Sequence, residues 1–133
     1  MYEFKAFGHK NISGKHLTTL EFTRYKILTP RGDCILGVEA DFDAFELRDF
    51  IERKIAKGDA KLTVHVKAGK HREIVKCTIN PTFDDPEEIV IRKGSFTSNR
   101  TLGIYADKAC VDFKRQMIKA LQNPEQEILV ILK

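Results

Sequence analysis

The sequence predicts an α+β fold dominated by β-strands, an antiparallel β-sandwich or flattened barrel of about eight strands with two helices. Apolar and polar residues alternate along most of the chain, and only two stretches show helical spacing. In addition, Leu-Gly-Val-Glu-Ala-Asp at 36–41 recurs as Leu-Gly-Ile-Tyr-Ala-Asp at 102–107, an offset of 66 in a chain of 133 residues. We therefore expect a single domain over 1–133, built from two β-β-β-α-β halves, 1–67 and 68–133, with a pseudo-twofold repeat.

In the first half, alternation predicts four strands, at 2–7, 16–25, 34–40 and 61–67. Residues 29–32, Thr-Pro-Arg-Gly, have the chemistry of a tight turn. An apolar stripe from Leu47 to Ile55 predicts a helix at 43–57. Gly58 ends this helix, because glycine adopts the left-handed conformation at little cost.

The second half repeats this order, with strands expected at 73–79, 88–92, 101–105 and 127–132. An apolar stripe from Cys110 to Leu121 predicts a helix at 107–122, which Asn123 and Pro124 end. Each half is thus expected to place one helix between its third and fourth strands.

Two repeated residue types have structural interpretations. Asp41 and Asp107 precede the two predicted helices, and an aspartate there accepts hydrogen bonds from free helical N–H groups. We expect both to act as helix caps. Gly37 and Gly103 lie inside strands, where glycine indicates a bulge or a close approach of another chain segment.

The composition predicts a globular protein of the cytoplasm. Hydrophobic residues make up 42% and charged residues 32%, and no apolar run reaches the roughly 20 residues that a membrane helix needs. We expect no membrane partner. Three cysteines without a CxxC pair indicate free thiols in a reducing compartment. The net charge of +4 is spread evenly, which is weak support for nucleic-acid binding.

Chemically versatile residues gather in a segment that the other half does not repeat. It contains His9, Asn11, His16, Thr18 and Glu21. Two imidazoles and a carboxylate can serve as metal ligands or as acid–base groups. However, their spacing matches no tight ligand motif, and strand alternation places His16 and Glu21 on opposite faces. The structural alternative is that His9 caps a turn and His16 packs at the start of a strand.

Two further places differ between the halves. Asp33 precedes Cys34, and its charge raises the pKa of a neighbouring thiol, which disfavours a nucleophilic cysteine, although a Cys–His pair stays open. Arg100 follows a run of hydroxyl and amide side chains. Lys108 lies in the expected first turn of a helix, where a cation needs an anion nearby: either Asp107 or a bound phosphate or carboxylate.

The leading functional hypothesis is a small-molecule site that binds an anionic ligand or hydrolyses it. Its candidate catalytic residues, with a histidine as general base, are His9, His16, Glu21 and Asp33. Its candidate ligand-binding residues are Asn11, Thr18, Arg100 and Lys108. The sequence names no cofactor or metal and leaves open whether the protein is an enzyme.

Two other classes of function stay open. The first is an RNA- or DNA-binding module with a basic sheet face and exposed aromatic residues such as Tyr2, Tyr25 and Tyr105. The second is a structural or interaction protein, for example a homodimer that uses a sheet edge.

Several motifs in order along the chain resemble an archaeal family known as domain of unknown function 371. They are Gly8-His9-x-Asn11-Ile12, His16-x-Thr18-Thr19-x-Glu21-x-Thr23, Gly32-Asp33-Cys34-Ile35, Arg100-Thr101-Leu102 and Ala106-Asp107-Lys108-Ala109. The resemblance covers nearly the whole chain. It implies an archaeal source and a β-rich sandwich with flanking helices, and it implies no activity. One departure is Cys110, where the family pattern has alanine.

Overall fold

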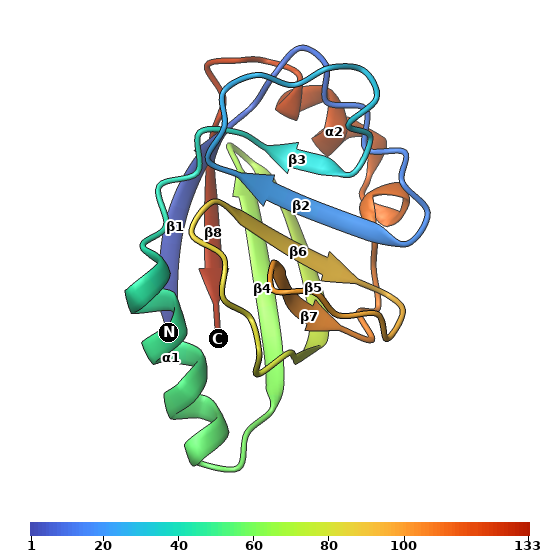
Figure 1. Cartoon of the computed structure of the whole chain (residues 1–133). Coiled ribbons are helices and arrows are strands. Elements are labelled where there is room, and N and C mark those ends of the chain that lie inside the picture. Colours follow the sequence, from blue (N-terminus) through green and yellow to red (C-terminus); the bar gives the residue numbers. More distant parts are fainter.

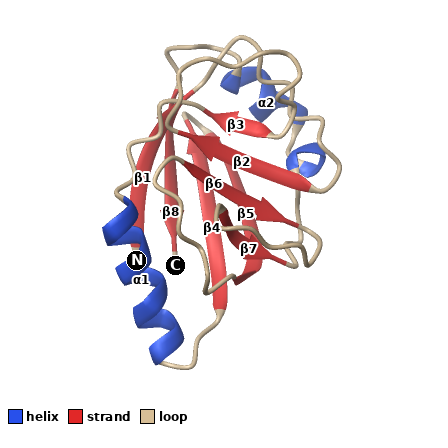
Figure 2. Ribbon diagram, in the orientation of Figure 1, coloured by secondary structure: helices blue, strands red, loops and turns tan.

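A computed structural model describes all residues, 1–133, and shows eight strands in one mixed sheet (Figures 1 and 2). The strands are β1 (Tyr2–Phe7), β2 (Thr19–Thr23), β3 (Ile35–Gly37), β4 (Lys61–Ala68), β5 (His71–Ile79), β6 (Glu88–Arg92), β7 (Thr101–Ile104) and β8 (Glu127–Leu132). Their order in the sheet is β1-β8-β4-β5-β7-β6-β2-β3. The predicted β-dominated α+β class is confirmed.

The two ends of this sheet meet. Phe7, at the end of β1, and Val38, just after β3, exchange both backbone hydrogen bonds at 2.8 Å. This pair closes the sheet into a barrel, so the two end strands are joined to each other at this point. The interior holds a single cluster of 32 buried apolar residues, in which Phe4 packs edge-on against Phe22 and Phe42.

Two neighbouring pairs are parallel, β2 with β3 and β6 with β7, where an antiparallel sheet was expected. The cause lies in the connections. The predicted turn at 29–32 does form, with the N–H of Gly32 donating to the carbonyl of Thr29 at 3.0 Å. It lies inside a long loop, 24–34, that carries the chain back to the end where β2 began. A loop at 93–100 does the same between β6 and β7.

The first helix is α1 (Ala44–Ala56), close to its predicted bounds. Asp43 caps it, because its side chain accepts the N–H of Glu46 at 3.0 Å. Gly58 follows with a φ of 78°, as predicted. The buried side chains of α1 are Leu47 and Ile51, which join the core.

The second helix is shorter than predicted. A single 3-10 turn (Cys110–Asp112) is followed by α2 (Arg115–Leu121), so a continuous helix at 107–122 is wrong. The side chain of Asp112 accepts the N–H of Ala109 and closes the turn. Phe113 and Lys114 are then extended, with ψ of 140° and 134°. The N–H of Lys114 donates at 2.7 Å to the buried carboxylate of Glu73 instead of to a helical carbonyl.

The expected capping role of Asp41 and Asp107 is also wrong. Asp41 accepts the N–H of Lys5 at 2.7 Å through its side chain and donates its own N–H to the carbonyl of Lys5 at 2.9 Å. Asp107 makes the same two contacts with Lys76, both at 2.9 Å. Asp41 therefore fastens the segment after β3 to β1, and Asp107 fastens the segment after β7 to β5. The first helix begins only at Ala44, three residues after Asp41.

The two glycines do mark close approaches, as expected. A Cβ on Gly37 would lie 3.0 Å from the Cβ of Ala6, and one on Gly103 would lie 2.5 Å from the sulfur of Cys77. Two residues further on, Glu39 and Tyr105 both have a φ of 54°. The halves thus share element order and local geometry at corresponding positions, while the duplication itself stays a prediction. Neither helix is long and apolar enough to cross a membrane.

Candidate functional site

Polar residues line the outer face of β2 and β6, and β2 is buried on both of its faces. Leu20 and Phe22 point into the core, as alternation predicts, and Glu21 points away from it. Even so, only 4% of the Glu21 surface is exposed. Burying a carboxyl group is costly unless it is neutral or paired, so the neighbours of Glu21 decide its state.

The nearest neighbour of Glu21 is a second carboxyl group, Glu88 at the start of β6. The antiparallel register places Glu21 opposite Val90, so Glu88 is its diagonal neighbour on the same face. The pKa of Glu21 is raised to about 8, first by burial and then by its hydrogen bond to Glu88 and the negative charge there. The raised pKa favours the protonated form of Glu21 at neutral pH, and this form shares a hydrogen bond with the side chain of Glu88.

Arg100 lies over this pair, just before β7. Its Nη1 is 3.3 Å from Oε2 of Glu88 and 3.6 Å from Oε1 of Glu21. Both distances exceed the roughly 2.7–2.9 Å of a tight charge-assisted hydrogen bond. The other guanidinium nitrogens of Arg100 have no partner in the protein, and 43% of its side chain is exposed. Arg100 is thus held loosely between the pair and the solvent.

A second guanidinium, that of Arg92, completes the cluster. Its Nε donates to the hydroxyl of Thr101 at 3.2 Å, and its guanidinium lies 5.0 Å from the centre of the Phe96 ring. Thr101 also accepts the N–H of Ser98 at 3.1 Å. With Glu21 in its protonated form, the two arginines and Glu88 give this cluster a net charge of +1. We call Glu21, Glu88, Arg92, Arg100 and Thr101 the β2–β6 cluster.

Cys34 borders the cluster but is not a nucleophile at neutral pH. Its carbonyl accepts the N–H of Glu21 at 2.8 Å. Burial, followed by the negative charges of Glu21 and Asp33, raises the pKa of its thiol to about 11. The thiol of Cys110 donates to the same carbonyl at 3.0 Å, and burial raises its pKa as well. Both sulfurs are therefore thiols at neutral pH.

Comparison with known proteins places the chain in a family. The family model described as Domain of unknown function (DUF371) matches residues 4–133. The chain belongs to this family. It is 34% identical over 134 residues to an uncharacterized protein of Methanocaldococcus jannaschii, and the match covers 96% of each chain. The resemblance seen in the sequence motifs is confirmed. Because the description of the DUF371 family states no activity, the function has to be argued from the site.

In this DUF371 protein, two of the eight predicted site residues meet in the β2–β6 cluster: Glu21 and Arg100. Three others lie at the margin of this cluster: His16, Thr18 and Asp33. His16 precedes β2, and its Nδ1 accepts the N–H groups of Thr18 and Thr19 at 3.2 and 3.1 Å. The backbone N–H of His16 donates to the carbonyl of Asp33 at 3.3 Å. His16 therefore organises the turn into β2, outside the strand in which it was expected.

The remaining three predicted residues are used elsewhere. Nδ1 of His9 accepts the N–H of Asn11, and the amide of Asn11 donates to the carbonyl of Leu28. Lys108 does have an anion nearby: its partner is Glu73, at 3.0 Å, and not Asp107. No three His, Cys, Asp or Glu side chains converge as a metal site, so the geometry does not support His9, His16 and Glu21 as joint ligands.

The sequence interpretation missed Glu88 and Arg92. They stand at the two ends of a short apolar strand, Glu-Ile-Val-Ile-Arg, and such charged ends are ordinary. The available signal was the alternation of side chains along each strand. It places Glu88 and Arg92 on one face of β6. It also places Thr19, Glu21 and Thr23 on one face of β2. Finding the site required pairing these two faces, which is a long-range contact.

Proposed function

We propose that this protein binds a small anionic molecule at the β2–β6 cluster and uses Glu21 as a proton donor toward it. The observation that carries the proposal is a protonated, buried Glu21 against Glu88, beneath a partly exposed arginine. A titratable group whose pKa is shifted by burial and by a specific charged partner is a candidate functional group.

The charges support an anionic ligand. The loosely held guanidinium of Arg100 has N–H groups to spare, and a carboxylate or phosphate is the planar or tetrahedral acceptor that it binds best. The net charge of +1, to which Arg92 beside Thr101 contributes, attracts an anion.

The two carboxyl groups support acid–base chemistry. Neighbouring carboxyl groups with separated protonation states can act as a general acid and a general base. In a hydrolysis, Glu21 would give its proton to the leaving atom while Glu88 accepts one from the attacking water. This keeps the predicted hydrolytic or binding function but assigns the proton transfer to carboxyl groups in place of a histidine. His16, Thr18 and Asp33 would contact the ligand only from the margin.

The test is a thermal-shift screen with carboxylate and phosphate metabolites and divalent metals. We expect at least one anion to raise the melting temperature of the wild type, and Arg100→Gln to remove this shift. Arg72→Gln is the matched control, because Arg72 is an exposed arginine on β5. Equal shifts in wild type and Arg100→Gln for every anion would contradict the proposal. Nucleic-acid binding and homodimer formation stay predictions.

A further inference from the structure

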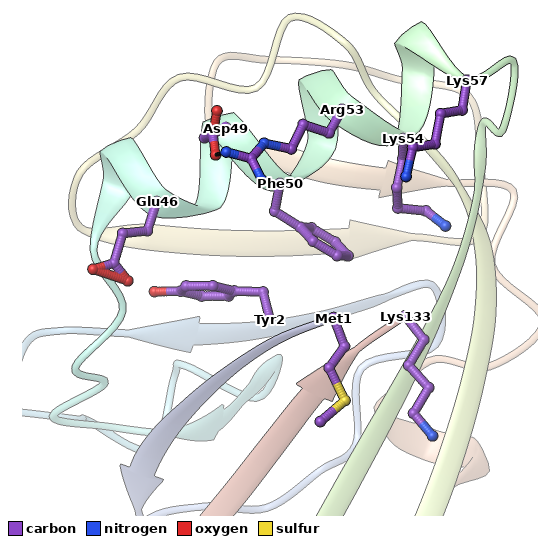
Figure 3. A pocket seen from close by; sticks show the side chains of 9 residues that line it. All are labelled: Met1, Tyr2, Glu46, Asp49, Phe50, Arg53, Lys54, Lys57 and Lys133. Carbon is purple, nitrogen blue, oxygen red and sulfur yellow. Dashed lines mark ion pairs between the residues drawn. The ribbon is translucent and has the colours of Figure 1, made fainter.

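The largest groove of the molecule does not have the charge pattern of an anion site. It measures about 660 Å³ and lies between α1 and the adjoining ends of β1 and β8 (Figure 3). Lys57 and Lys133 are well separated in this view, and the carboxylates of Glu46 and Asp49 lie among the cations. Positive charge is more concentrated on another side of the barrel, over the hairpin of β4 and β5.

This hairpin, 61–79, is strongly basic. It contains five cations against one carboxylate, and the cations are Lys61, Lys67, Lys70, Arg72 and Lys76. The carboxylate, Glu73, is buried on the other face of β5, where Lys108 binds it at 3.0 Å. The charge is even between the two halves of the sequence, but strand alternation gathers the cations of this hairpin on its outer side.

The outward positions of β4 and β5 form a continuous surface, which we call the β4–β5 face. They are Lys61, Thr63, His65 and Lys67 on β4 and Arg72, Ile74, Lys76 and Thr78 on β5. None of these side chains is buried, and none of the cations among them belongs to an ion pair. Lys61 and Lys67 are six residues apart, which is about 20 Å along a strand.

Two cations of the β4–β5 face lie directly opposite each other. The register pairs Lys67 with Arg72, and like charges in such a pair destabilise a sheet. The pKa of the neighbouring His65 is lowered, first by burial and then by the positive charges around it, to which Lys67 and Arg72 contribute. The face thus contains electrostatic repulsion that a bound anion would relieve.

The carboxylates at the border of this face leave the repulsion in place. Glu127 on β8 and Asp59 before β4 are each paired with a lysine outside the face, at 3.1 and 2.7 Å. Glu3 lies on β1, and β8 separates β1 from β4. Lys133, at the end of β8, adds no net charge, because the main-chain carboxylate of the last residue accompanies its ammonium group.

A groove of about 420 Å³ lies at one end of the β4–β5 face. Lys61 and Lys76 line it together with Tyr105, which follows β7. Tyr105 is 61% exposed, so its ring offers a surface on which a base can stack. Asp107 is the one carboxylate of the lining, and its side chain accepts the backbone N–H of Lys76 at 2.9 Å. The groove therefore combines an aromatic ring with a net positive charge.

The fold does not require an aromatic side chain at position 105. The backbone of Tyr105 is left-handed, with a φ of 54°, and Glu39 has the same φ at the corresponding position of the other half. Bulky side chains disfavour this conformation, which asparagine and glycine adopt more readily. An exposed ring in such a conformation points to a contact outside the fold.

We propose that the β4–β5 face binds a single strand of nucleic acid, RNA or DNA. The phosphates follow the cations from Lys61 and Lys76 to Lys67 and Arg72, and one base stacks on Tyr105. A polymer fits this face because the cations extend over about 20 Å, of which a small anion would contact only one end. A single strand fits better than a duplex, because its bases are free to stack.

This site shares no residue with the β2–β6 cluster, so either proposal can fail without the other. Because the β4–β5 face acts through several separated cations, it is a surface for a polymer and not a second site for small anions.

Fluorescence anisotropy with twelve-nucleotide strands of polyuridine and polythymidine tests the proposal over a range of salt concentrations. Each neutralised phosphate of a single strand contributes about −0.7 to the slope of log affinity against log salt, so four cations predict a slope of about −3. Lys61→Gln/Lys76→Gln should weaken binding at least about tenfold at low salt and make the slope shallower by about 1.4. The matched control, Arg31→Gln/Lys119→Gln, removes two exposed cations from loop 24–34 and α2 and should bind like the wild type.

Tyr105→Asn separates stacking from charge. It removes the ring and keeps a residue that tolerates the left-handed backbone, so the fold should persist. We expect binding about tenfold weaker at an unchanged salt slope. Tyr105→Phe keeps the ring and should bind like the wild type. Circular dichroism and thermal melting of each variant show whether the fold is retained.

Four results would overturn the proposal. The first is no binding of either strand by the wild type at low salt and submillimolar protein concentration, including the case in which vesicles of phosphatidylglycerol bind instead. The second is equal affinity of the wild type and Lys61→Gln/Lys76→Gln, and the third is equal affinity of the wild type and Tyr105→Asn. The fourth is tighter binding of a duplex of the same length than of either strand.

Discussion

Two glutamates of this protein are buried to the same extent and lie in opposite electrostatic surroundings. Glu21 and Glu73 are each 4% exposed. Both oxygens of Glu73 have a donor: the ammonium of Lys108 at 3.0 Å and the backbone N–H of Lys114 at 2.7 Å. Glu21 instead faces another carboxyl group, that of Glu88, and its nearest cation, Nη1 of Arg100, lies at 3.6 Å, too long for a tight hydrogen bond.

The difference separates a structural carboxylate from a candidate functional one. The contacts of Glu73 compensate a negative charge and fasten the segment between the 3-10 turn and α2 to β5. Those of Glu21 favour its neutral, protonated form. Burial alone therefore does not decide whether a glutamate is ionised; the number of donors that face its oxygens matters as well.

The same substitution at both positions is expected to have different effects on stability. At pH 5, Glu73→Gln should lower the free energy of unfolding by about 2 kcal/mol, because it removes the charge and turns an amide N–H toward existing donors. Glu21→Gln should change it by less than about 1 kcal/mol, because the amide replaces a protonated acid of the same shape. Urea unfolding measures both values.

Lys108→Met is the control for the first value, since it leaves Glu73 buried with one partner and should also destabilise the protein. Equal losses for Glu21→Gln and Glu73→Gln at pH 5 would mean that Glu21 is an ionised structural carboxylate, and the comparison would fail.

The second prediction concerns pH. The pKa of Glu21 is raised to about 8, so the folded protein keeps a proton that the unfolded chain releases above its ordinary pKa, about 4.3. The contribution of Glu21 to stability is therefore present at low pH and is lost as the pH rises toward 8. Between these two pKa values, the contribution of Glu21 to the free energy of unfolding falls by up to about 1.4 kcal/mol per pH unit.

Glu21→Gln removes this titration, so its stability relative to the wild type should increase steadily between pH 5 and pH 8. Urea unfolding at intervals of one pH unit follows the difference, in which the titration of groups that do not interact with Glu21 cancels. A difference that stays constant over this range would show that Glu21 is ionised throughout.

Much of the fold could be predicted from local patterns. Alternation located all eight strands, and the stripe from Leu47 to Ile55 located α1. Parallel pairing and the split second helix could not be predicted in this way. The apolar spacing from Cys110 to Leu121 suits one continuous helix. However, the backbone N–H of Lys114, which a continuous helix would bond to a helical carbonyl, donates to Glu73, 41 residues away in the sequence.

The candidate site shows the same limit. The outward face of Glu21 was predictable from β2 alone, and local turn capping by His9 was foreseen as an alternative. The burial of Glu21 and its contact with Glu88 depend on the pairing of β2 with β6, strands that are far apart in the sequence. Residue type suggested a histidine as general base, whereas the long-range packing of Glu21 against Glu88 is the basis on which we propose a carboxyl group instead.

The central claim is that Glu21 holds a proton at neutral pH, and a carbon-13 NMR titration of the glutamate side-chain carboxyl groups tests it most directly. Comparison with Glu21→Gln assigns the resonance. We expect the Glu21 carboxyl to titrate with a midpoint near pH 8, well above the ordinary glutamate value. A midpoint at or below about 4.3 would show an ionised Glu21 at neutral pH, and would contradict both the comparison with Glu73 and the proposed role as proton donor.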